Sequence, residues 1–248
     1  MAKQRHLSHA PITEALIDLR VTQQDGLTFS ELKNSVDPTE FGYYLKGPIS
    51  FGTFGFALAP DGQPSTTTES SQVGLRLHSN DEKYVAQFTI SGFTLSRLPP
   101  YETWENLLAE TRRLWAMYVQ RLSPKRVGRV ATRFINNLQL PLKPGASFQL
   151  YVNKLIDVPD EAPQAVETFL QRFCLVDIAT GARVILTLAL DGMSVGGPAP
   201  VILDVDAFVA TDLKPIDNTI WDNLEKLREL KNQSFFGTIT ELAAELYE

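Results

Sequence analysis

The 248-residue sequence predicts an α+β fold in which antiparallel sheets carry helices packed on one side. Strand-like segments follow one another as hairpins, and only a few long helices separate them. A doubly wound nucleotide-binding fold would instead need repeated strand–helix–strand units. Residues 1–142 and 143–248 run through similar elements in a different order. The sequence therefore predicts two α+β halves, which form either two similar, intertwined units or one single domain.

The first predicted elements are strands and one short helix. Residues 15–21 alternate as a strand, and residues 27–46 indicate a short helix with a connection after it. Residues 47–59 are rich in glycine and phenylalanine and predict another strand. Residues 60–72 are almost entirely polar, so we expect a mobile surface loop there.

A hairpin and the clearest helix follow. Residues 73–78 and 84–97 predict two strands joined by a tight turn. Apolar residues change parity within the second strand, and one extra residue at Gly92 would restore a continuous apolar face, so we predict a β-bulge there. Residues 104–122 carry apolar side chains at intervals of three or four, which is typical of an amphipathic helix.

The remaining elements start with a long strand over residues 127–140. The C-terminal half then predicts a helix over 159–171, strands over 173–179, 183–190 and 201–210, and a helix after Pro215. Residues 238–241 match a capping box and predict a last short helix.

The charge is unevenly distributed along the chain. Residues 97–133 carry 8 basic and 3 acidic side chains, and residues 134–248 carry 8 and 16. This asymmetry indicates either attraction between two parts of one fold or an anion-binding patch. The formal net charge of −6 argues against nucleic acid as a partner, although the basic segment leaves that alternative open.

The cysteine content and the hydropathy point to the cytoplasm. Cys174 is the only cysteine, and its apolar neighbours predict a buried, unreactive thiol and no disulfide. No stretch approaches the roughly 18 apolar residues that span a bilayer. Residues 1–6 are not followed by the apolar run of a signal peptide. We therefore expect a cytoplasmic protein that does not bind membranes.

The sequence lacks the motifs of several enzyme classes. It contains no phosphate-binding loop, no dinucleotide fingerprint and no nucleophile elbow. His6, His9 and His78 all precede residue 80, so a catalytic triad or a zinc site would depend almost entirely on His78. These absences favour a non-enzymatic binding or interaction protein without a cofactor, and we expect a protein partner or a homo-oligomer.

One face of the predicted sheet gathers polar, largely cationic side chains. Arg129, Arg133 and Asn137 point away from the core of their strand, and Arg76 and His78 do so on the neighbouring hairpin. Guanidinium groups on a rigid sheet suit the recognition of carboxylate or phosphate. These five residues are our candidate ligand-binding residues for a small anionic ligand. The alternative is a solvated face, or pairing with acidic residues of the other half.

A second constellation is the pair Asp204 and Asp206, which a strand places on one side. Two carboxylates so close repel each other unless positive charge lies between them. One alternative is Mg²⁺ or Mn²⁺, with Asp18 and Asp177 as further ligands, in a metal-dependent phosphohydrolase or nucleotide-binding protein. The other alternative is pairing with the arginines of residues 127–140, which also explains the charge asymmetry.

Four short segments resemble the motifs of a sporadically distributed, functionally uncharacterised bacterial family of similar length. They are Pro11-Ile12-Thr13-Glu14-Ala15-Leu16-Ile17, Arg129-x-x-x-Arg133-Phe134-Ile135-Asn136, Leu203-Asp204-Val205-Asp206-x-Phe208 and Phe235-Phe236-Gly237-x-Ile239-Thr240. The resemblance runs almost from end to end and implies a bacterial cytoplasmic protein. The patchy distribution of the family implies a mobile-element or phage-defence context.

Overall fold

In the part of the chain that the structure describes, nine antiparallel strands form one central sheet, in the order β2-β3-β4-β5-β1-β6-β9-β8-β7. The computed structural model describes residues 1–58, 64–142, 147–153, 158–159, 161–163, 166–192 and 197–248. The strands are β1 (Ile12–Thr22), β2 (Tyr43–Leu58), β3 (Pro64–Ser79), β4 (Tyr84–Thr89), β5 (Gly92–Arg97), β6 (Arg126–Leu140), β7 (Thr168–Val176), β8 (Arg183–Asp191) and β9 (Ala199–Leu213). The helices are α1 (Phe29–Ser35), α2 (Trp104–Leu122), α3 (Thr219–Thr238) and α4 (Glu241–Glu245), with short 3₁₀ helices η1 (Pro38–Phe41) and η2 (Phe148–Leu150). The predicted α+β class is confirmed.

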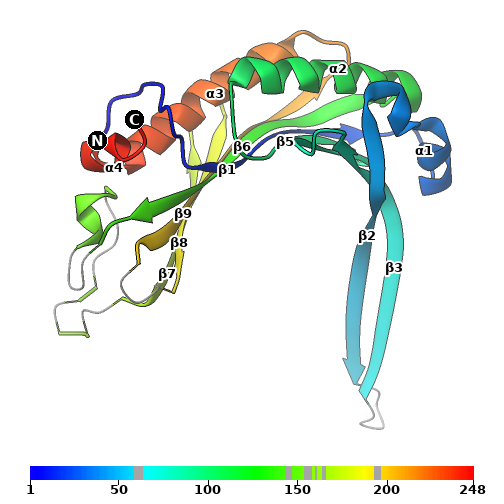
Figure 1. Ribbon diagram of the computed structural model, residues 1–248. Coiled ribbons are helices and arrows are strands. Elements are labelled where there is room, and N and C mark those ends of the chain that lie inside the picture. Colours follow the sequence, from blue (N-terminus) through cyan, green and yellow to red (C-terminus); the bar gives the residue numbers. More distant parts are fainter. Residues whose placement is uncertain (59–63, 143–146, 154–157, 160, 164–165, 193–196) are drawn as a thin grey trace.

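The sheet is arched, and helices α2 and α3 lie on its convex side (Figure 1). The β2–β3 hairpin and the β7–β9 strands bend away from the helices at opposite ends of the arch. We call the sheet face opposite α2 and α3 the concave face. Strands β6 and β9 pair from Val127 with Leu213 to Leu140 with Ala199, so one sheet runs through both predicted halves. The division into two domains stays a prediction.

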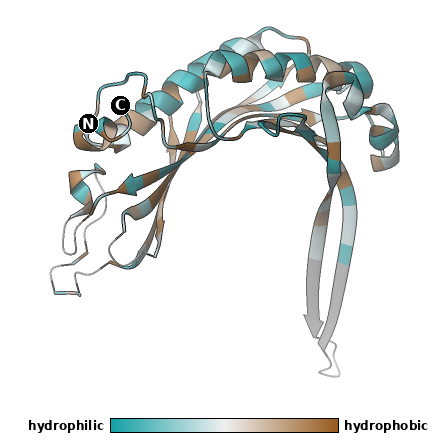
Figure 2. Cartoon of the chain, in the orientation of Figure 1, coloured by the Kyte–Doolittle hydropathy of each residue, from teal (hydrophilic) through white to brown (hydrophobic). Residues whose placement is uncertain are grey.

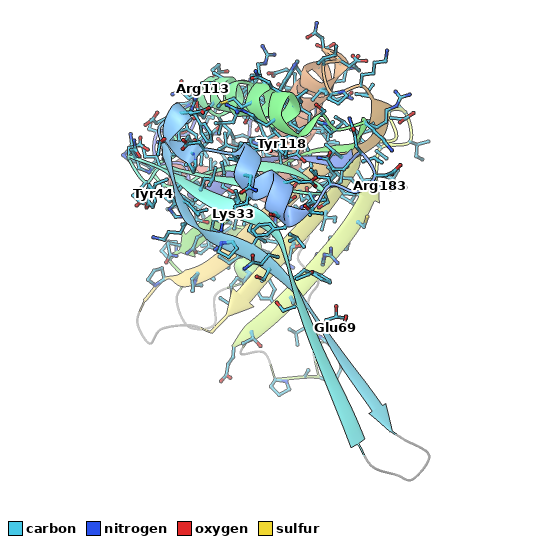
Figure 3. The ribbon with its side chains drawn as sticks, turned by 90° about the vertical axis from the view of Figure 1, so that its right-hand side faces the viewer. Lys33, Tyr44, Glu69, Arg113, Tyr118 and Arg183 are labelled. Carbon is cyan, nitrogen blue, oxygen red and sulfur yellow. The ribbon has the colours of Figure 1, made fainter. Side chains whose placement is uncertain are left out.

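Helix α2 covers the β1–β5 part of the sheet. Thr103 caps its N-terminus by accepting a hydrogen bond from the Asn106 amide at 3.1 Å. The apolar stripe predicted from the sequence is buried, and Tyr118 lies on the sheet side of the helix, where its hydroxyl donates to the Thr89 carbonyl at 2.9 Å (Figure 3). The outer side of the helix is mainly hydrophilic (Figure 2). Burial of one face therefore holds α2 on the sheet.

Helix α3 covers β6 and β9. Ile220, Leu224 and Leu227 form its buried side, as the helical spacing predicts. The Asp217 carboxylate accepts a hydrogen bond from the Thr219 amide at 2.9 Å at the start of this helix. The predicted capping box at residues 238–241 is wrong, because Thr238 ends α3 and Thr240 caps α4 by accepting from the Ala243 amide.

The predicted β-bulge at Gly92 is wrong, because the chain reverses there. Residues 84–97 form two strands, β4 and β5, which pair with Phe88 directly opposite Phe93. The change in apolar parity therefore marks a two-residue turn, which brings both rings to the same core at 5.4 Å between centroids. Gly92 is required for packing, since a Cβ atom there would lie 2.6 Å from the Leu19 carbonyl oxygen.

The loop predicted over residues 60–72 is wrong from Pro64 onward. These residues belong to β3, which pairs with β2 along the arm that extends from the sheet. Glu69 lies on this arm, away from the helices (Figure 3). Threonine favours extended backbone, so this polar run is compatible with a strand. Residues 59–63 lie outside the described residues.

The helix predicted over residues 159–171 is also wrong. The described residues among 158–167 form turns and irregular structure, and β7 begins at Thr168. Proline at 159 and 163 opposes a continuous helix, and Thr168-Phe169-Leu170 favours a strand. Strand β7 is largely exposed on both sides, so it lacks the alternation that identifies a half-buried strand.

Candidate functional site

The strand register places the five predicted ligand-binding residues on the concave face. Arg76 pairs with Gln87, Gln87 with Thr94, and Thr94 with Asp18. His78 and Arg133 lie in the adjacent row, where the pairs continue through Leu16 to Asp206. Strands β4, β5 and β1 separate Arg76 and His78 from β6. The register therefore confirms the shared face, although the five side chains do not form one cluster.

Arg129 is the centre of an ion-pair network on this face. Its Nη1 donates to Asp18 Oδ1 at 2.9 Å, and its Nη2 donates to both carboxylate oxygens of Asp206, at 3.2 and 3.0 Å. The guanidinium group also lies over the Phe208 ring, 4.4 Å from the centroid. These contacts fix the side chain from both neighbouring strands, β1 and β9.

Asp18 is the most enclosed member of the network, at 4% exposure. Besides the bond from Arg129, its Oδ1 accepts from Arg20 Nε at 3.0 Å, and its Oδ2 accepts from Thr94 Oγ1 at 2.7 Å. A buried carboxylate is tolerated only when donors and positive charge surround it. Asp18 satisfies this condition by joining β5, β1 and β6.

Arg133 forms a second, separate pair with Asp204. The guanidinium Nε and Nη2 donate to the two carboxylate oxygens at 2.8 and 2.6 Å, which is the bidentate fork geometry. The side chain of Arg133 is 41% exposed and that of Asp204 is 15% exposed. The late acidic pair thus meets the mid-chain arginines, as one of the two sequence alternatives predicts.

The pKa shifts follow from this arrangement. Burial raises the pKa of Asp206, and its neighbours Asp204 and Asp18 act in the same direction, while Arg129 and Arg133 oppose them. The hydrogen bonds to Asp204 raise the pKa of the Arg133 guanidinium. Asp206 therefore depends on the arginines to remain charged in this partly buried position.

A metal ion at Asp204 and Asp206 would have to displace the arginines that now pair with them. Both carboxylates of the acidic pair are occupied by arginine. Asp177 lies in the β7–β8 turn, where it accepts hydrogen bonds from the Ala179 amide and the Thr180 hydroxyl. Within the described ranges, no three His, Cys, Asp or Glu side chains are grouped so that they could hold a metal ion.

The other predicted residues have different surroundings. His78 Nδ1 lies 2.8 Å from Glu82 Oε2, and the Asn137 side-chain oxygen accepts from Gln139 Nε2 at 2.7 Å. Arg76 is exposed and has no ion pair with any described residue. It is therefore the one candidate arginine whose guanidinium is unoccupied within this part of the chain.

The prediction for Cys174 is wrong, since its thiol is exposed. It lies on β7, which forms one edge of the sheet. The same segment exposes Leu170 to 73% and Leu175 to 48%. The apolar run that indicated burial thus belongs to an edge strand, and the expected homo-oligomer stays a prediction.

Sequence reasoning missed a cavity of about 530 Å³ on the helix side of the molecule. The N-terminal segment, residues 101–105 and the second half of α3 surround it. Lys231 lines this cavity from α3, and we call it the Lys231 cavity. One signal was present in the sequence, because Lys231 follows the buried Leu227 by four residues and so falls on the inner side of the helix.

Comparison with known proteins adds no family. No protein-family model and no curated protein matches this sequence. None of the helices in the described part of the chain is long and apolar enough to cross a membrane.

Proposed function

We propose that this is a non-enzymatic binding protein whose concave face recognises an acidic surface of a partner protein. The observation that carries the proposal is a surplus of arginine on that face. Cross-strand pairing from β3 across the sheet to the edge strand β7 places six arginines on this face: Arg20, Arg76, Arg129, Arg133, Arg172 and Arg183. Acidic residues of the same rows include Glu14, Asp18, Asp204 and Asp206. The three aspartates pair with Arg20, Arg129 and Arg133, so the surplus consists of the arginines that no described carboxylate pairs with.

The surplus lies at the two ends of the arch. In the centre, Arg129 and Arg133 meet their carboxylates. Arg76 on β3, Arg183 on β8 and Arg172 on β7 are exposed and form no ion pair with another described residue. The concave face is thus nearly neutral in the middle and positive on both flanks.

The separation of the flanks favours a macromolecular partner. Five strands lie between Arg76 on β3 and Arg183 on β8. At about 4.8 Å between neighbouring strands, the two arginines stand roughly 25–30 Å apart along the sheet. A small anion engages one flank only, whereas an acidic protein surface reaches both. The resemblance to a sporadically distributed bacterial family supports a partner from a mobile-element or phage-defence context.

The test reverses the charge of both flanks. Polyglutamate serves as the defined acidic probe, and its binding to the wild-type protein is measured by calorimetry at low and high salt. We expect salt-sensitive binding that the R76E/R183E variant loses. The matched control is K33E/K226E, which makes the same change in charge on α1 and α3 (Lys33 is labelled in Figure 3). Equal loss in both double variants would contradict a specific role of the concave face.

The metal-dependent alternative has its own experiment. Calorimetry with Mg²⁺ or Mn²⁺ and a nucleoside triphosphate measures whether metal and nucleotide bind together. Turnover in that experiment, abolished by D204N, would replace the proposed binding function with a phosphohydrolase. Binding of polyglutamate without turnover would support the non-enzymatic proposal.

A further inference from the structure

The Lys231 cavity is large enough for a small molecule. Its volume of about 530 Å³ falls inside the range of about 300–1,000 Å³ typical of ligand pockets. Aromatic side chains supply much of its wall, among them Tyr101, Trp104, Phe134 and Phe235. Polar and charged side chains line the rest of the wall, so the cavity can hold an apolar or planar body against the rings while polar groups orient its charged end.

The polar group that distinguishes the cavity is the ammonium of Lys231. Its Nζ lies 3.7 Å from the centroid of Phe134, a residue only 2% exposed, and donates to Asn232 Oδ1 at 2.5 Å. No described carboxylate lies within ion-pair distance of it. The pKa of Lys231 is lowered to about 7, chiefly by burial and also by Arg228, while Glu229 opposes the shift.

The acidic residues around the cavity already have partners. Glu102 accepts from the buried Arg97 at 2.9 Å, and Glu105 pairs with Arg228 at 3.4 Å. The hydroxyl of Tyr101 and the side-chain amide N–H groups of Asn232 have no acceptor among the described residues. The cavity therefore combines an unpaired cation with unused hydrogen-bond donors, and it lacks a free carboxylate to complement them.

We propose that this cavity binds a small organic carboxylate with an aromatic or apolar body. The carboxylate forms an ion pair with Lys231 and accepts hydrogen bonds from Tyr101 and Asn232, while the aromatic wall covers the body of the ligand. One negative charge matches one ammonium.

Binding should be coupled to proton uptake. A carboxylate beside Lys231 favours the charged ammonium and raises its pKa, so a protein that is mostly neutral at Lys231 at pH 8 takes up a proton when the ligand binds. At most about 0.9 proton is expected, given a pKa of about 7 for Lys231. The other ionisable groups near the ammonium or on the cavity wall are Arg5, His6, Tyr101, Glu102, Glu105, Arg228 and Glu229.

The experiment uses benzoate and phenylacetate as probes, with benzyl alcohol as the uncharged control. Titration calorimetry at pH 8 in two buffers with different ionisation enthalpies yields both the affinity and the number of protons taken up. We expect the acids to bind with proton uptake and the alcohol to bind at least about tenfold more weakly. If the wild-type protein binds neither acid, or binds them without proton uptake, the proposal is wrong.

Two variants locate the binding. K231M should abolish both acid binding and proton uptake, whereas K226M, an exposed change on the same helix, should leave both unchanged. Y101F keeps the aromatic ring and removes the donor, so about a tenfold loss in affinity is expected. Unchanged acid binding in K231M, or in Y101F if K231M does not fold, would overturn the proposal. This cavity lies on the side of the sheet opposite the concave face, so the outcome is independent of the proposed function.

Discussion

The concave face and the Lys231 cavity differ in whether their buried charges have counter-charges. Arg129 lies between Asp18 and Asp206 and forms an ion pair with each of them, so all three charges are compensated. Lys231 lies against Phe134 with an amide oxygen as its acceptor, and no carboxylate of a described residue is within ion-pair distance of it. The first arrangement is complete in the protein alone. The second leaves an ammonium group without a counter-charge, which an anionic ligand can supply. This difference distinguishes a structural network from a binding site.

The largest effect is expected when the network loses its central cation. The R129L variant leaves Asp18 and Asp206 close together, both largely buried and without their shared partner. Removal of one member of a buried ion pair destabilises a protein by about 3–5 kcal/mol. We expect a loss of this size in the free energy of unfolding, measured by urea denaturation at pH 7.

The pH dependence of R129L tests the cause. Without Arg129, the already raised pKa of Asp206 rises further, so the folded state binds more protons than the unfolded state at mildly acidic pH. The stability gap between R129L and the wild-type protein should therefore narrow as the pH falls from 7 towards the ordinary range of a carboxylate. Addition of D206N to R129L should recover part of the loss at pH 7. A gap that does not change with pH would mean that lost packing dominates.

The opposite sign is expected for the cavity. K231M replaces an enclosed amine by an apolar side chain of similar length, so the free energy of unfolding should increase by about 1–3 kcal/mol at pH 7. In the wild-type protein the pKa of Lys231 is about 7 when folded, against about 10.5 when unfolded. Between these values the unfolded state binds more protons, so wild-type stability rises with pH. Denaturation at pH 7 and at pH 9 should show that K231M exceeds the wild-type protein in free energy of unfolding by less at pH 9 than at pH 7.

Strand parity explains how the network could be predicted from the sequence. Alternation along β6 and β9 assigns Arg129, Arg133, Asp204 and Asp206 to one face, and the antiparallel pairing of the two strands brings them together. That step needs only local pattern and one correct pairing. It does not identify Asp18 as the deepest member, because the position of β1 between β5 and β6 is a property of the whole sheet.

The cavity could not be predicted in the same way. Its walls come from the N-terminal segment, from residues 101–105 and from α3, which are far apart in the sequence. Local pattern was also misleading at Cys174, because an edge strand such as β7 can be apolar without being buried. The parity change at residues 90–92 fits a bulge and a turn equally well until the pairing of β4 with β5 is known.

A smaller loss is expected at the exposed end of the network. R133M removes the partner of Asp204, but the arginine side chain is 41% exposed and water can reach the carboxylate it leaves. We expect the free energy of unfolding to fall by about 1 kcal/mol. The difference between wild type and R133M should become smaller with added salt, because salt screens the ion pair of the wild-type protein. A loss as large as that of R129L would show that the two pairs act as one network, and a double-mutant cycle with D204N would measure their coupling.

The smallest effect on stability is expected at the flank of the concave face. Arg76 is exposed and has no charged partner in the described chain, so R76E should change the free energy of unfolding by no more than about 0.5 kcal/mol. The same variant should weaken polyglutamate binding, because it reverses one charge of the surplus that defines the face. Thermal denaturation and calorimetry on one preparation separate the two readouts. If R76E loses both stability and binding, Arg76 has a structural role. Arg183 would then be the arginine left to test binding at a flank of the concave face.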